Sequence, residues 1–423
     1  MVASKVLIVD DSRAITKLVS SIAQQAGFTP VVASCARDIE HVLDDPTHFL
    51  CACVDYNLPD APNGEAIDFV LGQAIPTFVL TGHLSETIRD TILSKPVIDY
   101  VPKETVQSFD YVGRLLVRLR DNRNVKILLV DDAKSSRTFM LALLARHNFN
   151  VLEADNGKTA LKVIQQHPDI KVVVTDNEMP EMNGINLVSE IRKSYSSDQM
   201  AIIGISGTNA LSLSARFLKN GANDYLTKPF SHEEFFTRIF RNLEFIENVD
   251  KAKYAANHDF LTDLTNRRAF FELAPALAQQ AFTQDQSCCI AIMDLDKFKS
   301  INDTYGHDTG DEVLVEMAKR LKSHFREQTI ITSRFGGEEF CVFFSNVSKD
   351  EAAGRLEFFR HHLETFAFEL SNGQPLAVTT SIGLSAIKPD SDNTQLVIDQ
   401  AISQADQALY QAKHQGRNLL VEF

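Results

Sequence analysis

Several common features are absent from this sequence, and each absence narrows what the protein can be. The 423 residues include no tryptophan. There are six cysteines, and no two of them form a CxxC pair. We therefore expect the thiols to be buried and reduced. No apolar run approaches the ~20 residues that a membrane-spanning helix needs. No secretory pattern precedes the first apolar segment, so we expect a cytoplasmic protein without membrane insertion.

Positive charge is outnumbered by negative charge, with 42 lysines and arginines against 56 aspartates and glutamates. The formal net charge is −14. Binding to a phosphate backbone requires a basic surface, so we expect no nucleic-acid partner. The length exceeds what one hydrophobic core usually supports, which predicts several domains.

An internal repeat fills the first two thirds of the chain. Residues 6–11 (VLIVDD) match residues 127–132 (ILLVDD), and the same offset brings Asp55 onto Asp176. Apolar strand-like runs alternate with helical patterns in both copies. This alternation predicts a parallel sheet with helices on both faces, in which functional groups gather at the carboxyl ends of the strands.

Both copies carry side chains suited to phosphoryl transfer: an acidic pair, a third acid, a hydroxyl, an aromatic ring and a lysine. In the first copy these are Asp10, Asp11, Asp55, Thr81, Tyr100 and Lys103. In the second they are Asp131, Asp132, Asp176, Ser206, Tyr225 and Lys228. Three acids at one sheet edge can bind one Mg²⁺, while an aspartate attacks the phosphoryl group and the lysine neutralises its charge.

The repeat resembles the response-regulator receiver domain, a doubly wound, flavodoxin-like fold. The resemblance implies that Asp55 and Asp176 accept a phosphoryl group from a histidine kinase or phosphotransfer protein, with one Mg²⁺ per receiver. It also implies that the hydroxyl and the aromatic ring respond to the new phosphate. A receiver kept only for packing would not need these groups. The first copy has a shorter segment after its acceptor and Glu104 where the second has Pro229, so which copy is phosphorylated stays open.

The last third contains a second acidic pattern. Residues 288–294 (CCIAIMD) predict a buried strand that ends in Asp294, and residues 334–340 (RFGGEEF) predict a tight hairpin. Glu338 and Glu339 follow the two glycines directly. Carboxylates from two strands, with Lys297 and Lys299 beside them, predict a site for Mg²⁺ and a phosphorylated substrate.

This region resembles the GGDEF family of diguanylate cyclases, from about residue 257 to the C-terminus. The other motifs that carry the resemblance are residues 258–268, 301–303, 306–307, 310–311, 379–384 and 408–418. The resemblance implies an α/β, nucleotidyl-cyclase-like domain with a mainly antiparallel sheet. It also implies that two GTP molecules are condensed into cyclic di-GMP.

Residue roles follow from the same resemblance. Two Mg²⁺ ions are expected on Asp294, Glu338 and the backbone carbonyl of Leu295, and Glu339 could be a further ligand or a base. The groups expected to bind GTP phosphates are the amides of Lys297 and Phe298 and the side chains of Lys299, Lys413 and Arg417. Asn302 and Asp311 match the family's guanine readers, and Arg334 could contact the partner's GTP or orient the hairpin.

These assignments predict receivers at residues 1–122 and 123–247, a helical linker at 248–257 and a GGDEF domain at 258–423. An amphipathic helix is expected from Ser231 to about Ala256, with an apolar stripe that could pack on its own sheet or pair with a second chain. The layout is similar to that of PleD-type diguanylate cyclases, in which activity requires a homodimer.

Two alternatives remain beside the enzyme. The domain could be a catalytically silent sensor of GTP or cyclic di-GMP that acts through a protein partner, or an inert tail on a phosphorelay adaptor; the intact acids disfavour both. Many family members also carry an inhibitory Arg-x-x-Asp site before the glycine pair. Here residues 327–330 read EQTI, and Arg326 is out of register. We therefore expect weak product inhibition or none through that site.

Overall fold

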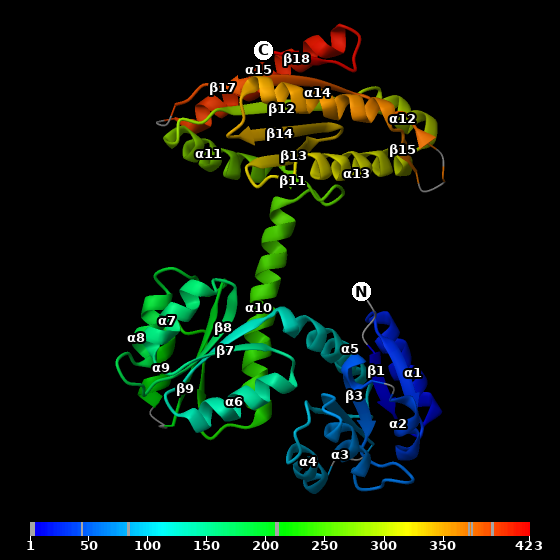
Figure 1. The fold of residues 1–423 in the computed structure, drawn as a ribbon, viewed down its shortest axis with the longest axis vertical. Helices are drawn as coiled ribbons and strands as arrows, with labels where there is room; N and C mark the ends of the chain where they lie inside the picture. The colour runs from blue at the N-terminus through cyan, green and yellow to red at the C-terminus, as the bar shows by residue number, and fades with distance from the viewer. Residues whose placement is uncertain are drawn as a thin grey trace. The chain divides into compact units, whose positions relative to one another are not determined.

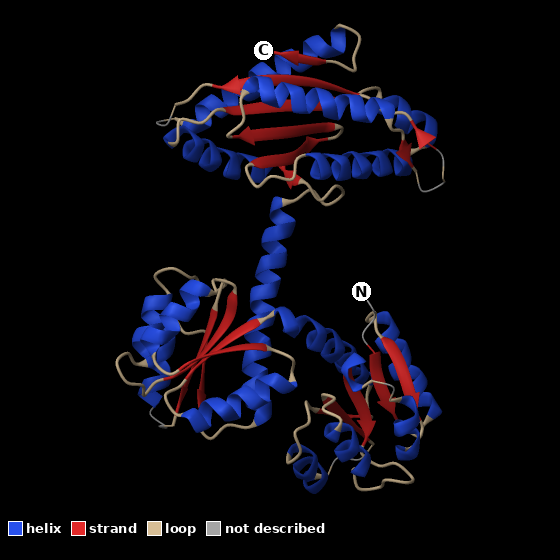
Figure 2. Cartoon of the chain, in the orientation of Figure 1, coloured by secondary structure: helices blue, strands red, loops and turns tan. Residues whose placement is uncertain are grey.

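The protein forms two compact units, Met1–Asn248 and Val249–Phe423 (Figure 1). The computed structural model describes residues 5–43, 45–82, 85–207, 211–370, 373, 375–390 and 393–423. Two parallel five-stranded sheets lie in the first unit, and one mixed six-stranded sheet lies in the second (Figure 2). The expected fold class, two doubly wound α/β domains followed by a different α/β domain, is confirmed.

The first domain is a doubly wound sheet with strand order β2-β1-β3-β4-β5. Its elements are β1 Lys5–Val9, α1 Arg13–Gln25, β2 Thr29–Ala33, α2 Ala36–Val42, β3 Phe49–Asp55, α3 Glu65–Gly72, β4 Thr77–Thr81, α4 Glu86–Leu93, β5 Tyr100–Pro102 and α5 Val106–Asp121. Every residue of β3 is buried, as expected for a central strand covered on both faces. Helices α1 and α5 pack on one face, and α2, α3 and α4 on the other.

The second domain repeats this topology, with strand order β10-β9-β8-β6-β7. Its elements are β6 Lys126–Val130, α6 Lys134–Arg146, β7 Asn150–Ala154, α7 Gly157–Gln166, β8 Ile170–Asp176, α8 Gly184–Ile191, β9 Ala201–Ser206, α9 Leu211–Lys219, β10 Asp224–Thr227 and α10 His232–Asn257. The central strand β8 ends at Asp176, as β3 ends at Asp55. The two copies of the sequence repeat therefore have the same fold. In the second domain, the peptide bond between Lys228 and Pro229 is cis.

Helix α10 is 26 residues long and continuous. Its buried side chains include Phe235, Ile239, Leu243 and Ile246, which follow the 3–4 spacing of one helix face and join the core of the second domain. Residues 250–256 are exposed. The apolar stripe thus packs against the second domain's own sheet, and the later turns carry solvated side chains.

The C-terminal domain is built on a sheet with order β11-β13-β14-β12-β17-β18. Its elements are β11 Thr265–Asn266, α11 Arg267–Thr283, β12 Cys288–Leu295, α12 Phe298–Tyr305, α13 His307–His324, β13 Ile330–Gly336, β14 Glu339–Ser345, α14 Lys349–Thr365, β15 Phe368–Glu369, β16 Pro375–Leu376, β17 Thr380–Ile387, α15 Thr394–His414 and β18 Leu420–Glu422. Strand β12 lies between β14 and β17 and is antiparallel to both. Helices α12, α13 and α14 cover one face, and α11 and α15 cover the other.

Five of the six cysteines are buried, and Cys35 is half-buried. Burial raises the pKa of Cys51, Cys53 and Cys341, and it raises the pKa of Cys289 to about 12. These thiols are packed as small apolar side chains. No helix in the described ranges combines the length and apolarity needed to cross a bilayer.

Candidate functional site

The first domain gathers three carboxylates where its strands end. Asp10 follows β1, Asp11 comes next in the chain, and Asp55 closes β3; their ligand oxygens all lie within 4.8 Å of one another. Asp10 and Asp55 are buried and Asp11 is exposed. A set of hard oxygen donors open to solvent on one side fits a magnesium ion.

Lys103 closes this cluster from the end of β5. Its Nζ atom lies 2.6 Å from Asp10 Oδ2 and 2.7 Å from Asp55 Oδ2. Burial raises the pKa of Asp55, against the opposing effect of Lys103. Burial alone would lower the pKa of Lys103, but its hydrogen bonds to the two aspartates outweigh that effect and raise it. The lysine therefore stays charged, as an acceptor of phosphoryl charge must.

Thr81 and Tyr100 occupy the ends of neighbouring strands in this domain. Thr81 is buried at the end of β4. Tyr100 begins β5, and its hydroxyl lies 3.1 Å from Glu233 of the second domain and 3.3 Å from Arg89 Nε. The ring of Tyr100 is thus engaged at the contact between the two domains and not turned toward the acidic cluster.

The second domain brings together a matching set. Lys228 Nζ lies 2.7 Å from Asp131 Oδ2 and 2.7 Å from Asp176 Oδ1. The Ser136 hydroxyl donates to Asp131 Oδ2 at 2.6 Å, so lysine and serine share one oxygen. Asp132 is exposed. Over the described residues, the three acids of this domain do not approach within 4.8 Å as those of the first domain do.

The hydroxyl and the aromatic ring also have counterparts here. Ser206 is buried at the end of β9. Tyr225 packs against Phe217 with ring centres 5.6 Å apart, and its hydroxyl is buried. The two tyrosines therefore differ, since Tyr225 lies inside its own domain whereas Tyr100 lies at the contact between domains.

In the C-terminal domain, two adjacent strands present acids at one edge. Strands β13 and β14 form the expected hairpin, with Gly336 and Gly337 at φ 153° and 49°. Such angles favour glycine. On β14, Glu339 pairs directly with Asp294 of β12. The Leu295 amide donates to the Glu338 carbonyl at 3.3 Å, so the turn is fixed against the end of β12.

Lys413 reaches this edge from the last turn of α15. Its Nζ atom lies 2.7 Å from Asp294 Oδ2. Burial raises the pKa of Asp294, Lys413 opposes that effect, and the negative charges of Glu338 and Glu339 add to it. Among the described residues, the oxygens of Asp294, Glu338 and Glu339 do not come within 4.8 Å of one another as those of the first domain do. A buried carboxylate in contact with an ammonium group, with two further acids on the neighbouring strand, still suits a cation that binds between acids and phosphate.

Arg334 contacts both the glycine turn and the entrance motif. Its guanidinium donates to the Gly337 carbonyl at 2.8 and 3.0 Å and to Asp259 Oδ1 at 2.9 Å. Asp259 also accepts the amide and the hydroxyl of Thr262. The entrance motif at 258–268 thus holds the arginine that supports the glycine turn.

Asp296 was missed from the sequence, although it lies two residues beyond Asp294. Its buried carboxylate accepts hydrogen bonds from the Thr379 hydroxyl at 2.8 Å, the Ser381 hydroxyl at 2.6 Å and the Asn418 amide at 2.9 Å. The Asn418 amide lies in a loop whose residues Gly416, Arg417 and Asn418 all have positive φ. The only local signal for Asp296 was its spacing from Asp294, with one residue between them in an Asp-x-Asp pattern. The hydroxyl groups that bond to Asp296 lie more than eighty residues away in sequence.

The remaining predicted substrate contacts lie around α12. Lys297 precedes the helix with φ 58°, Phe298 is its first residue and is buried, and Lys299 is exposed. Asn302 lies against Gly310 of α13, where an added Cβ would come within 1.9 Å of the Asn302 Oδ1 atom. Asp311 is exposed one residue later.

The segment expected to lack an inhibitory site forms other contacts. Glu327 accepts a hydrogen bond from Arg355 at 2.9 Å, and Arg326 is exposed. The Glu327 carboxylate is thus paired with an arginine of α14.

Fold and site together define a class of signalling protein: a phosphoacceptor-type α/β domain followed by a domain with an acidic hairpin. Comparison with protein families gives the same division. The model described as "Response regulator receiver domain" matches residues 127–240, and "Diguanylate cyclase, GGDEF domain" matches residues 256–419. The first domain shares the strand order of the second.

Three similar proteins place the chain more closely. Response regulator PleD of Caulobacter vibrioides is 29% identical over 309 residues, 71% of this chain and 66% of PleD. The uncharacterized protein YhcK of Bacillus subtilis is 45% identical over 167 residues, 39% of this chain and 45% of YhcK. A solved structure of a probable two-component system response regulator/GGDEF domain protein has a TM-score of 0.52 and 40% identity, covering 58% of this chain and 99% of that one. The chain belongs to the response regulators that carry a GGDEF domain.

Proposed function

We propose that this protein is a phosphorylation-regulated diguanylate cyclase that condenses two GTP molecules into cyclic di-GMP and two pyrophosphates across a homodimer. The observation that carries the proposal is the pairing of Asp294 with Glu339 across adjacent strands, with Lys413 bonded to Asp294. Acids and a lysine at one sheet edge suit a triphosphate bound with metal.

We assign the following roles to the residues at this edge. Asp294, Glu338 and the Leu295 carbonyl would hold two Mg²⁺ ions, which neutralise charge on the triphosphate when bound. Glu339 would be a further ligand or a base. Phosphate contacts would come from Lys413, the exposed Lys299, the loop residue Arg417 and the amides before α12. Arg334 would keep the glycine turn in place.

Specificity for guanine would come from the pair Asn302 and Asp311 at the junction of α12 and α13. A carboxylate accepts hydrogen bonds from guanine N1–H and N2–H₂, and adenine lacks that donor pair. An unpaired carboxylate would penalise ATP strongly.

Control of the activity would come from the two N-terminal domains, at 1–122 and 123–247, through the helical segment 248–257. We propose that both are receivers with Asp55 and Asp176 as phosphoacceptors, each with one Mg²⁺ and with a histidine kinase or phosphotransfer protein as donor. Support comes from the lysine in contact with two aspartates in each domain. Each GGDEF domain supplies half of a two-GTP site, so phosphorylation would act by holding two halves together.

Turnover of GTP with Mg²⁺, followed by nucleotide chromatography with and without beryllofluoride at several protein concentrations, tests the proposal. We expect cyclic di-GMP, with a specific rate that rises with concentration and with beryllofluoride. Asp294→Asn should abolish the product, and Asp55→Asn and Asp176→Asn should assign the activating receiver. GTP binding without product under any condition would instead support a silent sensor that acts through a protein partner.

A further inference from the structure

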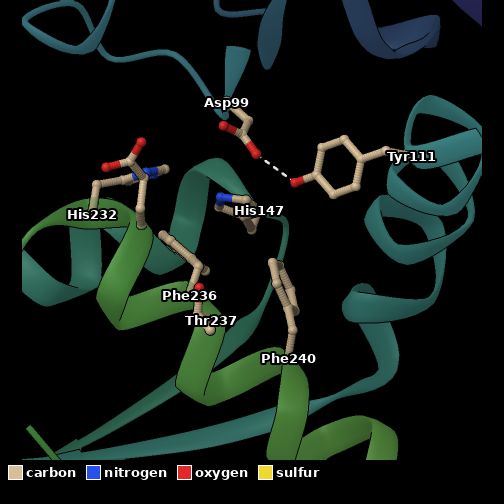
Figure 3. A pocket seen from close by; sticks show the side chains of 8 residues that line it. Asp99, Tyr111, His147, His232, Phe236, Thr237 and Phe240 are labelled. Carbon is tan, nitrogen blue, oxygen red and sulfur yellow. Dashed lines mark hydrogen bonds between the residues drawn. The ribbon is translucent and has the colours of Figure 1, made fainter. Parts of the chain in front are cut away.

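A cavity of about 180 Å³ lies within the first unit, where the two α/β domains meet (Figure 3). The first domain contributes Asp99 and Tyr111 to its lining. The second domain contributes His147, His232 and Phe236, among others. This cavity is separate from both acidic clusters, and nothing in the proposed cyclase chemistry uses it.

Two histidines at this cavity lack a hydrogen-bond partner within the normal limits of distance and angle among the described residues, although a backbone group of Ile98 lies near enough to His147 to act on its pKa. His147 follows the last turn of α6 and is 1% exposed, and His232 is the first residue of α10. The buried, unpartnered atoms include both ring nitrogens of each histidine. Phe236 lies against both rings, with centre-to-centre distances of 3.7 and 4.7 Å.

These imidazoles are suited to ligation. Burial lowers the pKa of His147 well below its usual value and lowers that of His232 to about 4, so both rings are neutral near pH 7. A neutral imidazole has a free lone pair, and leaving a buried polar atom without a partner is unfavourable. A ligand in the cavity would therefore supply a partner for the ring nitrogens that face it.

Carboxylates complete the polar lining. Asp99 accepts hydrogen bonds from the Tyr111 hydroxyl and the Tyr100 amide. Glu233, next to His232, accepts from Arg89 and contacts the Tyr100 hydroxyl. Both acids are held at the cavity but keep oxygen lone pairs for a further partner.

We propose that this cavity binds one divalent transition-metal cation of the zinc class through His147 and His232. Their ring centres are 5.7 Å apart. Two imidazoles that share a tetrahedral ion at about 2.0 Å have ring centres roughly 5 Å apart, so only a small adjustment is needed. Among the described residues, no third side chain has a ligand atom close enough to both histidines to bind the same ion. The Glu233 or Asp99 carboxylate would therefore have to rotate toward the ion, and water would complete its coordination shell.

The donor set separates this site from the magnesium sites. Imidazole nitrogen favours zinc, cobalt, nickel and copper, whereas clusters of carboxylates favour magnesium. Both histidines belong to the second domain, so an ion would stabilise the contact between the domains only where Asp99 of the first domain is its third ligand.

The test uses the metal-free full-length protein in excess Mg²⁺, which fills the acidic clusters. Zn²⁺ is titrated by calorimetry, and Co²⁺ by its visible absorption. We expect one ion per chain, bound with imidazole ligands. His147→Gln and His232→Gln should each weaken binding at least ~10-fold, by analogy with losses on disturbing a metal site, while the exposed control His48→Gln should leave it unchanged.

A variant that keeps a ligand guards against misfolding as the explanation. His232→Cys should retain Co²⁺ and add a thiolate-to-cobalt absorption band, which a merely structural histidine would not give. Absence of stoichiometric binding, or equal affinity in His232→Gln and the unmodified chain, would overturn the proposal and leave a water-filled cavity.

Discussion

At the scale of single residues, Asp296 illustrates how a buried acid can order a loop. The Asp296 carboxylate accepts hydrogen bonds from two hydroxyl groups at the start of β17 and from a backbone amide in the loop after α15. That loop contains Arg417, which is expected to contact phosphate. Holding Arg417 and Asn418 at positive φ costs free energy, and the hydrogen bond from the Asn418 amide to the charged acid offsets part of that cost.

Replacing this acid should loosen the loop without removing any group that touches GTP. Asp296→Asn keeps the size but replaces a charged acceptor with a neutral amide, so the hydrogen bond from the Asn418 amide is weakened. We expect the KM for GTP to rise about tenfold, the usual scale for a supporting residue, with a smaller change in kcat. Steady-state kinetics measures both. The exposed control Asp399→Asn should have neither effect, and an unchanged KM in Asp296→Asn would contradict the role.

At the scale of elements, the C-terminal domain depends on how closely α15 approaches β17. A Cβ atom at Gly383 would lie 2.0 Å from the Ala405 carbonyl oxygen and 2.3 Å from the Leu409 nitrogen. Both are backbone atoms, which cannot rotate away. Lys413 is carried by the same helix, so the approach also fixes the distance from that lysine to Asp294.

Gly383→Ala should therefore destabilise the domain. Overpacking typically costs about 1–3 kcal/mol, and rigid backbone favours the upper part of this range. Gly354→Ala on α14 is the matched control, because nothing lies within 4 Å of its added Cβ. In a helix that change should stabilise by roughly 0.5–1 kcal/mol. The midpoint of thermal unfolding should fall in Gly383→Ala and rise in Gly354→Ala. Equal shifts in the two variants would show that the close contact between α15 and Gly383 does not determine the stability of the domain.

Helix α10 supports a second prediction at this scale. Lys251 lies in its exposed later turns, away from the stripe that packs in the second domain. Lys251→Pro removes a hydrogen bond and breaks the helix at a cost of ~3 kcal/mol, whereas Lys251→Ala preserves it. We expect the proline variant to bind GTP but to lose activation by beryllofluoride, with the alanine variant unaffected. Retained activation in the proline variant would exclude this helix as the connection.

Features that depend on neighbouring residues in the sequence could be predicted, whereas features that depend on residues distant in sequence could not. Strands, the glycine hairpin and the repeat could be predicted because alternating apolar runs and paired glycines are local signals. The pairing of Asp294 with Glu339 was expected only as a shared sheet edge, since register depends on neighbouring strands. The bonds of Asp296, and the outward position of Tyr100, depend on partners distant in sequence and could not be predicted locally.

At the scale of the molecule, the first unit contains a direct contact between its two α/β domains. Arg89 and Tyr100 of the first domain bond to Glu233 at the start of α10, and Arg118 of α5 bonds to Glu247 on the same helix. If phosphorylation of Asp55 draws Tyr100 inward, its bond to Glu233 must break. The first domain would then signal through the helix that leaves the second.

This coupling can be measured in an Asp176→Asn background, where beryllofluoride acts on the first domain alone. Glu233→Ala should change the response to beryllofluoride, because the acid that joins Tyr100 to α10 is gone. Exposed ion pairs alone contribute little, about 0–1 kcal/mol, so overall stability should stay nearly unchanged. Glu244→Ala, an exposed position on the same helix, is the control. Identical responses in both variants would rule out this route.

The buried thiols have a practical consequence for observing such motions. An ordinary thiol ionises near pH 8.5, whereas the pKa of Cys289 is raised to about 12 by burial. The unfolded chain therefore releases protons that the folded chain keeps, and the free energy of unfolding should fall as the pH rises through 9. A thiol-reactive dye should modify Cys35 alone in the native protein and six sites in denaturant. With Cys35→Ser as a chemically silent background, a pair of introduced surface cysteines could carry fluorophores that report in real time how a phosphoryl signal moves through the chain.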